Sequence, residues 1–401
     1  MEKRINIQVV SIGAGGNGAS IAAIEKNVIS KDDVLLINST NRDIPLDYQE
    51  NAYIYDTLGG AGKQYIEGER LINHEIEKPN GLSDRLNEFI KEDTDLVVVI
   101  YTSEGGTGAG GGDTLAKYIN EEIGVATTIL LISGFQEDPQ GLDNTISVFK
   151  NLPEGVSINV VSNIKGLTVK QDHAEAQEII NNDIATKISV LMTNGIVDGD
   201  TQFVIDETDL YNTEAFPGYT FIEKVELPKL ASKDQFNQAM REMIINSKSI
   251  DFEKDKKTAK RAVFINLKDE SEAQFIDYEF PVLVEYFGSL HEVYKHVQYQ
   301  KNQPSYVSLI NSGMSLPLTF VSEIQELKKK KLAEVVTKDN NFSQKVAEME
   351  TQTEPNFNVT RRRRRNTSNT SGKDFVIENA KKKAEEEQQK RIVEDDISKN
   401  Y

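Results

Sequence analysis

The sequence predicts an α/β protein with a doubly wound parallel sheet, a long central helix, an α+β second domain, a C-terminal helix and a disordered tail. Three observations lead to this prediction. Apolar runs alternate with helical stretches over residues 1–165, glycine tracts follow several of these runs, and the composition turns polar from Thr351. The expected boundaries of the five parts are 1–172, 173–195, 196–318, 319–350 and 351–401.

The apolar runs of the first part are continuous in Val, Ile and Leu instead of alternating with polar residues. Such runs are typical of parallel strands that helices cover on both faces of a sheet. In a doubly wound sheet the ligand lies beyond the carboxyl ends of the strands. We expect strands at Ile5–Ile12, Val34–Ile37, Ala52–Ile54, Leu96–Tyr101, Thr127–Ile132 and Ile158–Val161.

The segment from His173 to Met192 repeats apolar residues at helical spacing, and Asn194-Gly195 supplies a suitable C-terminal cap. A helix with so wide an apolar surface is expected to lie buried between two domains. In the second domain we expect strands near Tyr219–Val225, Ala262–Leu267 and Tyr306–Leu309, and helices near Asp234–Asn246 and Pro281–His291. Beyond it, Val321 to Val335 place one apolar stripe on a C-terminal helix.

The composition excludes several classes of site. The chain has no cysteine, which rules out disulfides and thiolate metal sites and fits a reducing cytosol. The charged N-terminus leads directly into a strand, and no apolar stretch approaches the roughly 18 residues of a membrane span. These observations predict a cytoplasmic protein with no membrane partner. The four histidines lack metal-ligand spacing, so no metal ligands are predicted among them; they are His74, His173, His291 and His296.

Charge is distributed unevenly along the chain. The formal net charge is −18, but residues 355–401 hold 12 Lys/Arg and 8 Asp/Glu, so the rest of the chain carries −22. An acidic body repels DNA, so any contact with DNA is expected to be indirect, through the tail or a partner protein. The run Arg361–Arg365 serves either such a contact or only the solubility of the tail.

Three glycine-rich loops follow predicted strands. Thr102–Gly112 leads from a strand directly into a helix, where bare N–H groups can approach phosphate oxygens and the helix dipole favours negative charge. Gly13–Gly18 matches G-x-G-x-x-G, and Gly59–Lys63 follows the third strand without the spacing of a P-loop. The second strand ends in Asn38–Asn41, where a dinucleotide-binding dehydrogenase usually carries Asp or Glu. The three loops predict a polyphosphate held by backbone amides.

These motifs resemble those of the tubulin/FtsZ superfamily of filament-forming GTPases. The signature loop of that superfamily reads G-G-G-T-G-[ST]-G, and here the signature loop is Glu104–Gly110. The resemblance covers about residues 5–320 and implies that 1–172 is a GTP-binding domain. The diverged sequence and basic tail resemble the plasmid-segregation tubulins (TubZ type) more than FtsZ, whose C-terminal partner peptide is not recognisable.

The resemblance also implies a set of nucleotide-binding residues. The first loop and the signature loop would contact phosphates, and the third loop would lie beside the γ-phosphate. In the ribose loop, Phe135–Gly141, Gln140 stands where FtsZ has a glutamate, and Asn163 would reach the nucleoside. The base would meet either Gln177 or Asn182 on the central helix. The chosen set is Gly13, Ala14, Gly15, Gly16, Asn17, Gly18, Gly60, Ala61, Gly62, Lys63, Gly105, Gly106, Thr107, Gly108, Ala109, Gly110, Gln140, Asn163 and Asn182.

Two further departures from the superfamily pattern matter for the site. Glu104 replaces the first signature glycine, so its carboxylate is expected to face away from the phosphates or to help order Mg²⁺ through water. Gly18 replaces an amide-bearing residue that helps to hold guanine in relatives.

A carboxylate pair follows the central helix. Asp206 and Asp209 form D-x-x-D, which the resemblance identifies as the catalytic pair that enters the pocket of the next subunit. Two carboxylates three residues apart at a helix start share one face and can orient a water for attack on the γ-phosphate. The alternative is a purely structural N-cap at Asp206 with a solvated acid at Asp209.

The resemblance therefore implies a cytoplasmic GTPase that binds GTP/GDP and Mg²⁺ and hydrolyses GTP on head-to-tail assembly. Its partners would be further copies of itself and a DNA-binding adaptor at the basic tail, through which it segregates plasmid or phage DNA. Three alternatives remain open: an FtsZ-like cytoskeletal or division polymer, a nicotinamide-dependent oxidoreductase of the Rossmann type, and a scaffold that binds nucleotide without hydrolysing it.

Overall fold

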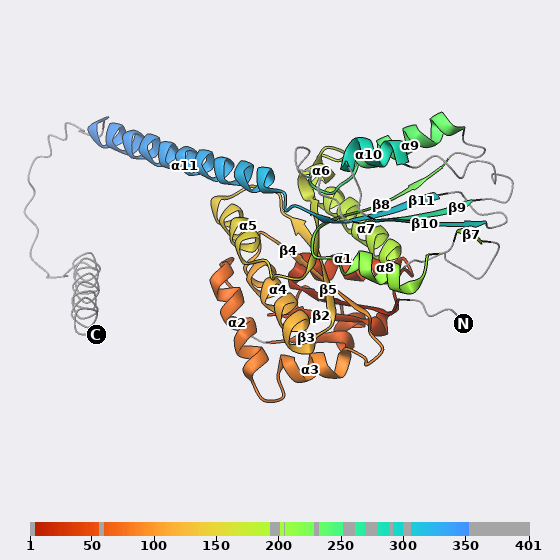
Figure 1. Ribbon diagram of the computed structural model, residues 1–401. Helices are drawn as coiled ribbons and strands as arrows, with labels where there is room; N and C mark the ends of the chain where they lie inside the picture. The colour runs from red at the N-terminus through yellow and green to blue at the C-terminus, as the bar shows by residue number, and fades with distance from the viewer. Residues whose placement is uncertain are drawn as a thin grey trace, which may run out of the picture. The chain divides into compact units, whose positions relative to one another are not determined.

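The structure is a computed structural model of the chain (Figure 1). It describes residues 5–55, 60–192, 201–203, 205–227, 232–251, 261–268, 280–288, 292–299 and 306–352. The chain forms two compact units, residues 1–339 and 340–401, and the features below belong to the first. Helix α11 includes the first two residues of the predicted tail, and the rest of that tail and the predicted cap Asn194-Gly195 lie outside the described residues.

The first half of the chain builds the predicted parallel sheet. Its strand order is β3-β2-β1-β4-β5-β6, and every pairing is parallel. All residues of β1, β2 and β6 are buried, as the continuous apolar runs predicted. The strands are β1 (Ile7–Ile12), β2 (Val34–Asn38), β3 (Ala52–Ile54), β4 (Leu96–Thr102), β5 (Ala126–Ser133) and β6 (Ser157–Ser162).

The second half continues the same sheet as β6-β8-β11-β9-β10-β7. Parallel pairing of Ser157 with Gly218 joins β8 to β6, and β11 runs antiparallel to both β8 and β9. Strands β7 and β10 were not predicted. The strands are β7 (Thr201–Phe203), β8 (Gly218–Glu226), β9 (Arg261–Lys268), β10 (Glu292–Tyr299) and β11 (Tyr306–Met314).

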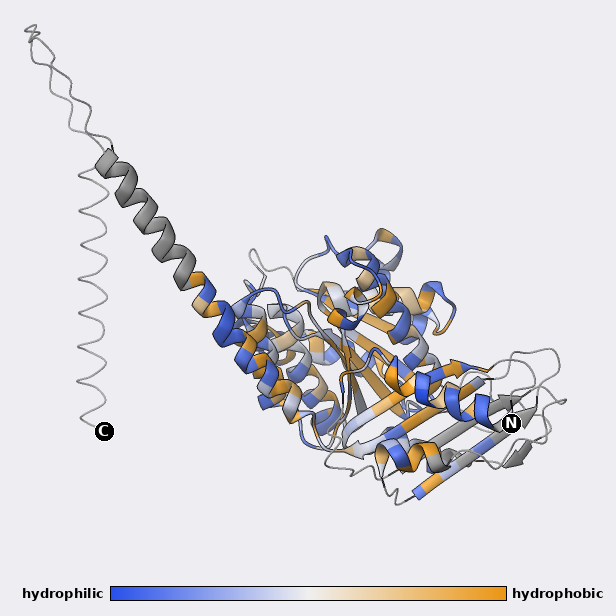
Figure 2. Cartoon of the chain, turned by 90° about the horizontal axis from the view of Figure 1, so that it is seen from above, coloured by the Kyte–Doolittle hydropathy of each residue, from blue (hydrophilic) through white to orange (hydrophobic). Residues whose placement is uncertain are grey.

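Helices cover both faces of the sheet (Figure 1). One apolar cluster joins a face of the sheet to α2, α3, α4, α5, α9 and α10, and a second joins the other face to α1, α7 and α8. The strands that carry colour in Figure 2 are mostly hydrophobic, while the helices also carry hydrophilic residues. The helices are α1 (Gly13–Glu25), α2 (Tyr65–Glu77), α3 (Leu82–Phe89), α4 (Gly106–Tyr118), α5 (Pro139–Asn151), α6 (Asn163–Leu167), α7 (His173–Leu191), α8 (Glu207–Glu214), α9 (Lys233–Ile245), α10 (Phe280–Phe287) and α11 (Leu318–Gln352).

The predicted helix at 281–291 is too long at its C-terminal end. Helix α10 stops at Phe287 because Gly288 adopts a left-handed φ of 74° and donates its N–H to the carbonyl of Val284 at 3.0 Å. The chain then enters β10 at Glu292. Among the described residues, no helix is both long and apolar enough to cross a membrane.

The central helix α7 packs on the face of the sheet that α1 also covers, where the two halves of the sheet join at β6 and β8. It begins at His173 because the Asp172 carboxylate accepts the N–H groups of Ala174 and Glu175. Its buried Lys187 forms an ion pair with Glu223 of β8 at 2.7 Å. Helix α7 therefore connects the N-terminal strands rigidly to the C-terminal ones.

Candidate functional site

The first two glycine loops meet at the carboxyl edge of the sheet. Gly13 follows β1 with a φ of 78°, and a Cβ atom on it would lie 3.1 Å from the backbone nitrogen of Gly108. Glycine allows this close backbone approach. The N-termini of α1 and α4 consequently open at one place, where their first N–H groups have no acceptor within the helix. Such a pair of helix ends favours an anion.

Only part of the signature loop can use its N–H groups in this way. The N–H of Ala109 already donates to the carbonyl of Gly105 at 3.2 Å, so Gly106, Thr107 and Gly108 are the residues at the open end. Gly110 instead allows α4 to approach α2, because a Cβ there would lie 2.6 Å from the nitrogen of Glu69.

The third loop closes on the start of α4. Gly60, Gly62 and Lys63 all have left-handed φ angles, between 54° and 58°. A Cβ atom on Gly106 would meet Ala61 at 2.9 Å, so the loop packs directly against the first turn of α4. The Ser39 hydroxyl after β2 lies 3.4 Å from that of Thr107, which brings a second hydroxyl to the same edge.

The side chain of Lys63 is directed to the ribose loop. Its ammonium forms an ion pair with Asp138 at 2.5 Å, and Asp138 caps α5 by accepting the N–H of Gly141 at 3.0 Å. Burial raises the pKa of Asp138, but Lys63 and the Gly141 amide outweigh it and lower that pKa overall. The predicted place of Lys63 beside a γ-phosphate stays a prediction.

The carboxylate of Glu104 also turns to the ribose loop. It accepts the N–H of Gln136 at 2.6 Å, and the Cβ of Glu104 lies 3.2 Å from where a Cβ on Gly141 would stand. Burial raises the pKa of Glu104, and the Gln136 amide opposes that effect. This bond supports the expectation that Glu104 faces away from the phosphates.

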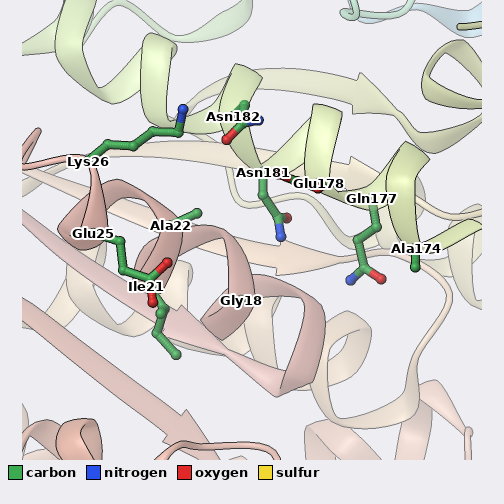
Figure 3. A pocket seen from close by; sticks show the side chains of 10 residues that line it. All are labelled: Gly18, Ile21, Ala22, Glu25, Lys26, Ala174, Gln177, Glu178, Asn181 and Asn182. Carbon is green, nitrogen blue, oxygen red and sulfur yellow. The ribbon is translucent and has the colours of Figure 1, made fainter. Parts of the chain in front are cut away.

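A pocket of about 500 Å³ lies between α1 and α7 (Figure 3). Gln177 and Asn182, the two predicted alternatives, both line it. Figure 3 shows Gln177 and Asn181 extending towards α1, and the Asn181 amide nitrogen lies 3.7 Å from where a Cβ on Gly18 would stand. The lining residues are Gly18, Ile21, Ala22, Glu25, Lys26, Ala174, Gln177, Glu178, Asn181 and Asn182.

Asn181 was missed in the sequence. Its position four residues after Gln177 places both amides on one helix face, which is the signal that could have identified it. Its Oδ1 is buried without a hydrogen-bond partner among the described residues. The same holds for Oδ1 of Asn163, which begins α6 directly after β6. The side chain of Asn17, by contrast, is used within the fold, since it bonds Ser11 at 2.9 Å and the Ile37 carbonyl.

Asp206 and Asp209 lie at the opposite edge of the sheet. At the end of their helix α8, the Glu214 carbonyl accepts the hydroxyl of Thr128, near the amino end of β5. Between the two edges runs α7, whose 19 residues span about 28 Å. Asp206 also caps α8 by accepting the N–H of Asp209 at 2.7 Å. The structure therefore does not bring this pair to the glycine loops of its own chain.

Comparison with known proteins reveals similarity at the level of sequence. No protein-family model matches the chain. The cell division protein FtsZ of Aquifex aeolicus (strain VF5) is 24% identical over 220 residues, which is 50% of this chain and 56% of that protein. The chain thus matches about half the length of this curated relative.

Solved structures resemble the chain over most of its length. A GTPγS-form protofilament of TubZ from Bacillus thuringiensis serovar israelensis has a TM-score of 0.66 at 17% identity, covering 86% of this chain and 94% of TubZ. CetZ from Methanosaeta thermophila strain DSM 6194 has a TM-score of 0.62 at 17% identity, with coverage of 87% and 97%. GTPγS-bound CetZ2 of Haloferax volcanii, also a protofilament, has a TM-score of 0.64 at 16% identity, with coverage of 81% and 99%. The chain has the tubulin/FtsZ fold.

Proposed function

We propose that the chain is a filament-forming GTPase that hydrolyses GTP to GDP when subunits join head to tail. The phosphates would lie at the starts of α1 and α4, and the base would lie in the pocket between α1 and α7. The observation that carries the proposal is the position of Asp206 and Asp209 at the far edge of the sheet from both. A second subunit stacked on the first would present its pair to the glycine loops of its neighbour.

The chemistry proposed for this composite site is hydrolysis of a phosphoanhydride. The carboxylates of one subunit would orient and polarise a water for in-line attack on the terminal phosphate. The N–H groups of Gly106, Thr107 and Gly108 in the neighbouring subunit would stabilise the charge that develops on the phosphate oxygens. Neither subunit alone holds both parts, so hydrolysis would depend on assembly.

The site suits an Mg²⁺ ion that binds together with the phosphates of the nucleotide. The described residues contain no group of three His, Asp or Glu side chains able to bind a metal by themselves. The hydroxyls of Ser39 and Thr107 supply oxygen atoms at the phosphate edge, and Mg²⁺ prefers oxygen, water and phosphate ligands. When bound, Mg²⁺ would neutralise charge on the phosphates.

Exposed apolar residues support head-to-tail contact. Ile66 and Val169 come after β3 and β6, towards the glycine-loop edge, and are 77% and 55% exposed. Leu46, which is 82% exposed, lies towards the opposite edge, because the carbonyl of the next residue, Asp47, accepts the ammonium of Lys31 before β2. Tyr211 is exposed on α8, the helix of the carboxylate pair. Contact between two different surfaces does not close, so it produces a filament. The TubZ and CetZ2 structures named above are protofilaments, and both contain GTPγS, which supports the same assembly and ligand here.

A concentration series tests this function. With GTP and Mg²⁺, light scattering and phosphate release should both begin at the same threshold of protein concentration. Without GTP, neither signal should appear. Phosphate release proportional to protein at every concentration would contradict a site shared between subunits, and filaments that never turn over would indicate a non-hydrolysing scaffold.

We further propose that the filament moves plasmid or phage DNA in the cytoplasm through a DNA-binding adaptor held by the basic tail. The support is the contrast between a net charge of +4 over residues 355–401 and −22 over the rest. Removing 355–401 should leave GTP hydrolysis unchanged and abolish adaptor binding. Unchanged adaptor binding, or DNA binding by the full chain alone at physiological salt, would contradict this role.

A further inference from the structure

Asn144 joins three segments at the carboxyl edge of the sheet. It lies in the second turn of α5 and is 1% exposed. Its Nδ2 donates to the carbonyls of Lys63 at 3.1 Å and Glu104 at 3.0 Å. Its Oδ1 accepts the backbone N–H of Tyr65 at 3.2 Å and the side-chain amide of Gln140 at 3.1 Å. All the hydrogen-bonding capacity of one amide is thereby used.

These bonds anchor the 60–64 loop and the start of α2 to α5. The 60–64 loop contains three residues with left-handed φ angles and ends where Tyr65 begins α2. The first N–H groups of a helix need an acceptor from outside it, and Asn144 supplies one to Tyr65. A second tie to the same region is the ion pair of Lys63 with Asp138, the cap of α5. Helix α5 therefore contacts the loop twice, at the backbone through Asn144 and at the Lys63 side chain through Asp138.

The 60–64 loop lies where the end of a phosphate chain would arrive. The pocket lies on the face of the sheet covered by α1 and α7, whereas Ala61 and Tyr65 belong to the apolar cluster of the other face. A nucleotide with its base in that pocket would extend its phosphates over the sheet edge, past Gly106, towards Ala61 and Lys63. The outermost phosphate is the group that would meet this loop.

We propose that Asn144 is a positioning residue that holds the 60–64 loop against Glu104 and the start of α4, so that the site favours a nucleoside triphosphate over a diphosphate. This inference rests on the proposed GTPase function. It concerns the selection of the ligand's phosphate number, which neither the starts of α1 and α4 nor the carboxylate pair explains.

The substitution Asn144→Asp isolates this role. Aspartate has nearly the same shape and keeps the acceptor for Tyr65, but it places a carboxylate oxygen opposite the carbonyls of Lys63 and Glu104. Both donated bonds are lost, and the loop is repelled from α5. We expect affinity for GTPγS to fall at least tenfold and affinity for GDP to change less than threefold.

Asn159→Asp is the matched control. Asn159 is a fully buried residue of β6 whose Nδ2 donates to the Thr220 carbonyl at 2.7 Å and to Ser249 at 3.1 Å. This variant loses the same kind of bonds away from the glycine loops. It should be less stable to heat but keep the wild-type ratio of GTPγS to GDP affinity.

The experiment is equilibrium binding of GTPγS and GDP to the full chain, below the concentration of assembly. An equal loss of both affinities in Asn144→Asp, or no loss, overturns the inference. If this variant does not fold, Asn144→Ser, which is uncharged and too short to reach both carbonyls, is judged by the same ratio. Wild-type protein that binds neither nucleotide contradicts the proposed function instead.

Discussion

At the scale of single residues, burial decides the chemistry of several acidic side chains. The Glu104 carboxylate accepts a backbone N–H of the ribose loop, and the Asp138 carboxylate forms an ion pair with Lys63. Glu214, at the end of α8, differs from both, because both of its carboxylate oxygens are buried without a partner among the described residues. Burial raises its pKa well above the usual value of 4.5.

Glu214 should therefore make stability depend on pH. The pKa of Glu214 is higher in the folded than in the unfolded chain. Its contribution to the free energy of unfolding is therefore fully present below about pH 4.5 and is lost as the pH rises towards the folded pKa. Glutamine does not ionise, so Glu214→Gln avoids this loss. Its free energy of unfolding at pH 7 should exceed that of the wild type by about 1–3 kcal/mol. Urea unfolding at pH 6, 7 and 8 measures the difference. We expect the difference in the free energy of unfolding to grow with pH, by up to about 1.4 kcal/mol per pH unit.

Glu226→Gln is the control, since Glu226 is an exposed carboxylate on the neighbouring strand β8. Equal stability of wild type and Glu214→Gln at all three pH values would show that Glu214 is not buried as a neutral acid.

At the scale of elements, α8 shows how one residue can carry two interpretations. Asp206 caps the helix, as the structural alternative proposed, and it also stands where the catalytic pair is proposed. The cap needs only an oxygen acceptor, whereas orientation and polarisation of a water need the charge. The two roles can therefore be separated by substitution.

Asp206→Asn and Asp206→Ala separate them. Asparagine keeps a cap of similar strength but removes the charge, whereas alanine removes both and should destabilise the protein by about 0.5–2 kcal/mol. With a catalytic role, both variants should release phosphate at least a hundredfold more slowly. Thermal unfolding and phosphate release above the assembly threshold measure the two effects. Normal phosphate release by Asp206→Asn would leave Asp206 as a cap alone.

At the scale of the whole molecule, the sheet places the proposed halves of one active site at opposite edges. Its parallel half has the order 3-2-1-4-5-6 that dinucleotide-binding folds share, but here the sheet continues through β8 and carries α7 on one face, where the two halves join. The TubZ and CetZ structures cover 86% and 87% of this chain, so their similarity extends into this continuation.

Assembly should depend on the apolar residues at the glycine-loop edge. Ile66→Glu places a charge in the proposed contact, so the concentration threshold for light scattering should rise at least tenfold, while GDP affinity of the monomer stays unchanged. Ile245→Glu is the matched control, because Ile245 is 65% exposed on α9 and lies outside the proposed contact. Equal thresholds for the two variants would exclude this edge as an assembly surface.

Much of the fold could be predicted from local patterns in the sequence. Continuous apolar runs identified all six strands of the parallel half, and glycine tracts marked the loops that the structure gathers at one edge. The spacing of apolar residues also located α7 to within a few residues. Strands, glycine turns and the apolar face of a helix depend on residues that are close together in the sequence. The order of residues therefore shows them directly. The domain boundaries and the roles of the site residues stay predictions.

By itself, then, the sequence determined the α/β class, the strands of the parallel half and the presence of phosphate-type loops. Only the tertiary structure decided that Asn144 joins these loops, that Glu104 turns towards Gln136, and that Asn181 faces Gly18. The partners in these contacts are 32 to 163 residues apart in the chain, and their burial follows from packing across helices and strands. Such contacts leave no periodic pattern along the chain, because they form only once the sheet has brought its loops together.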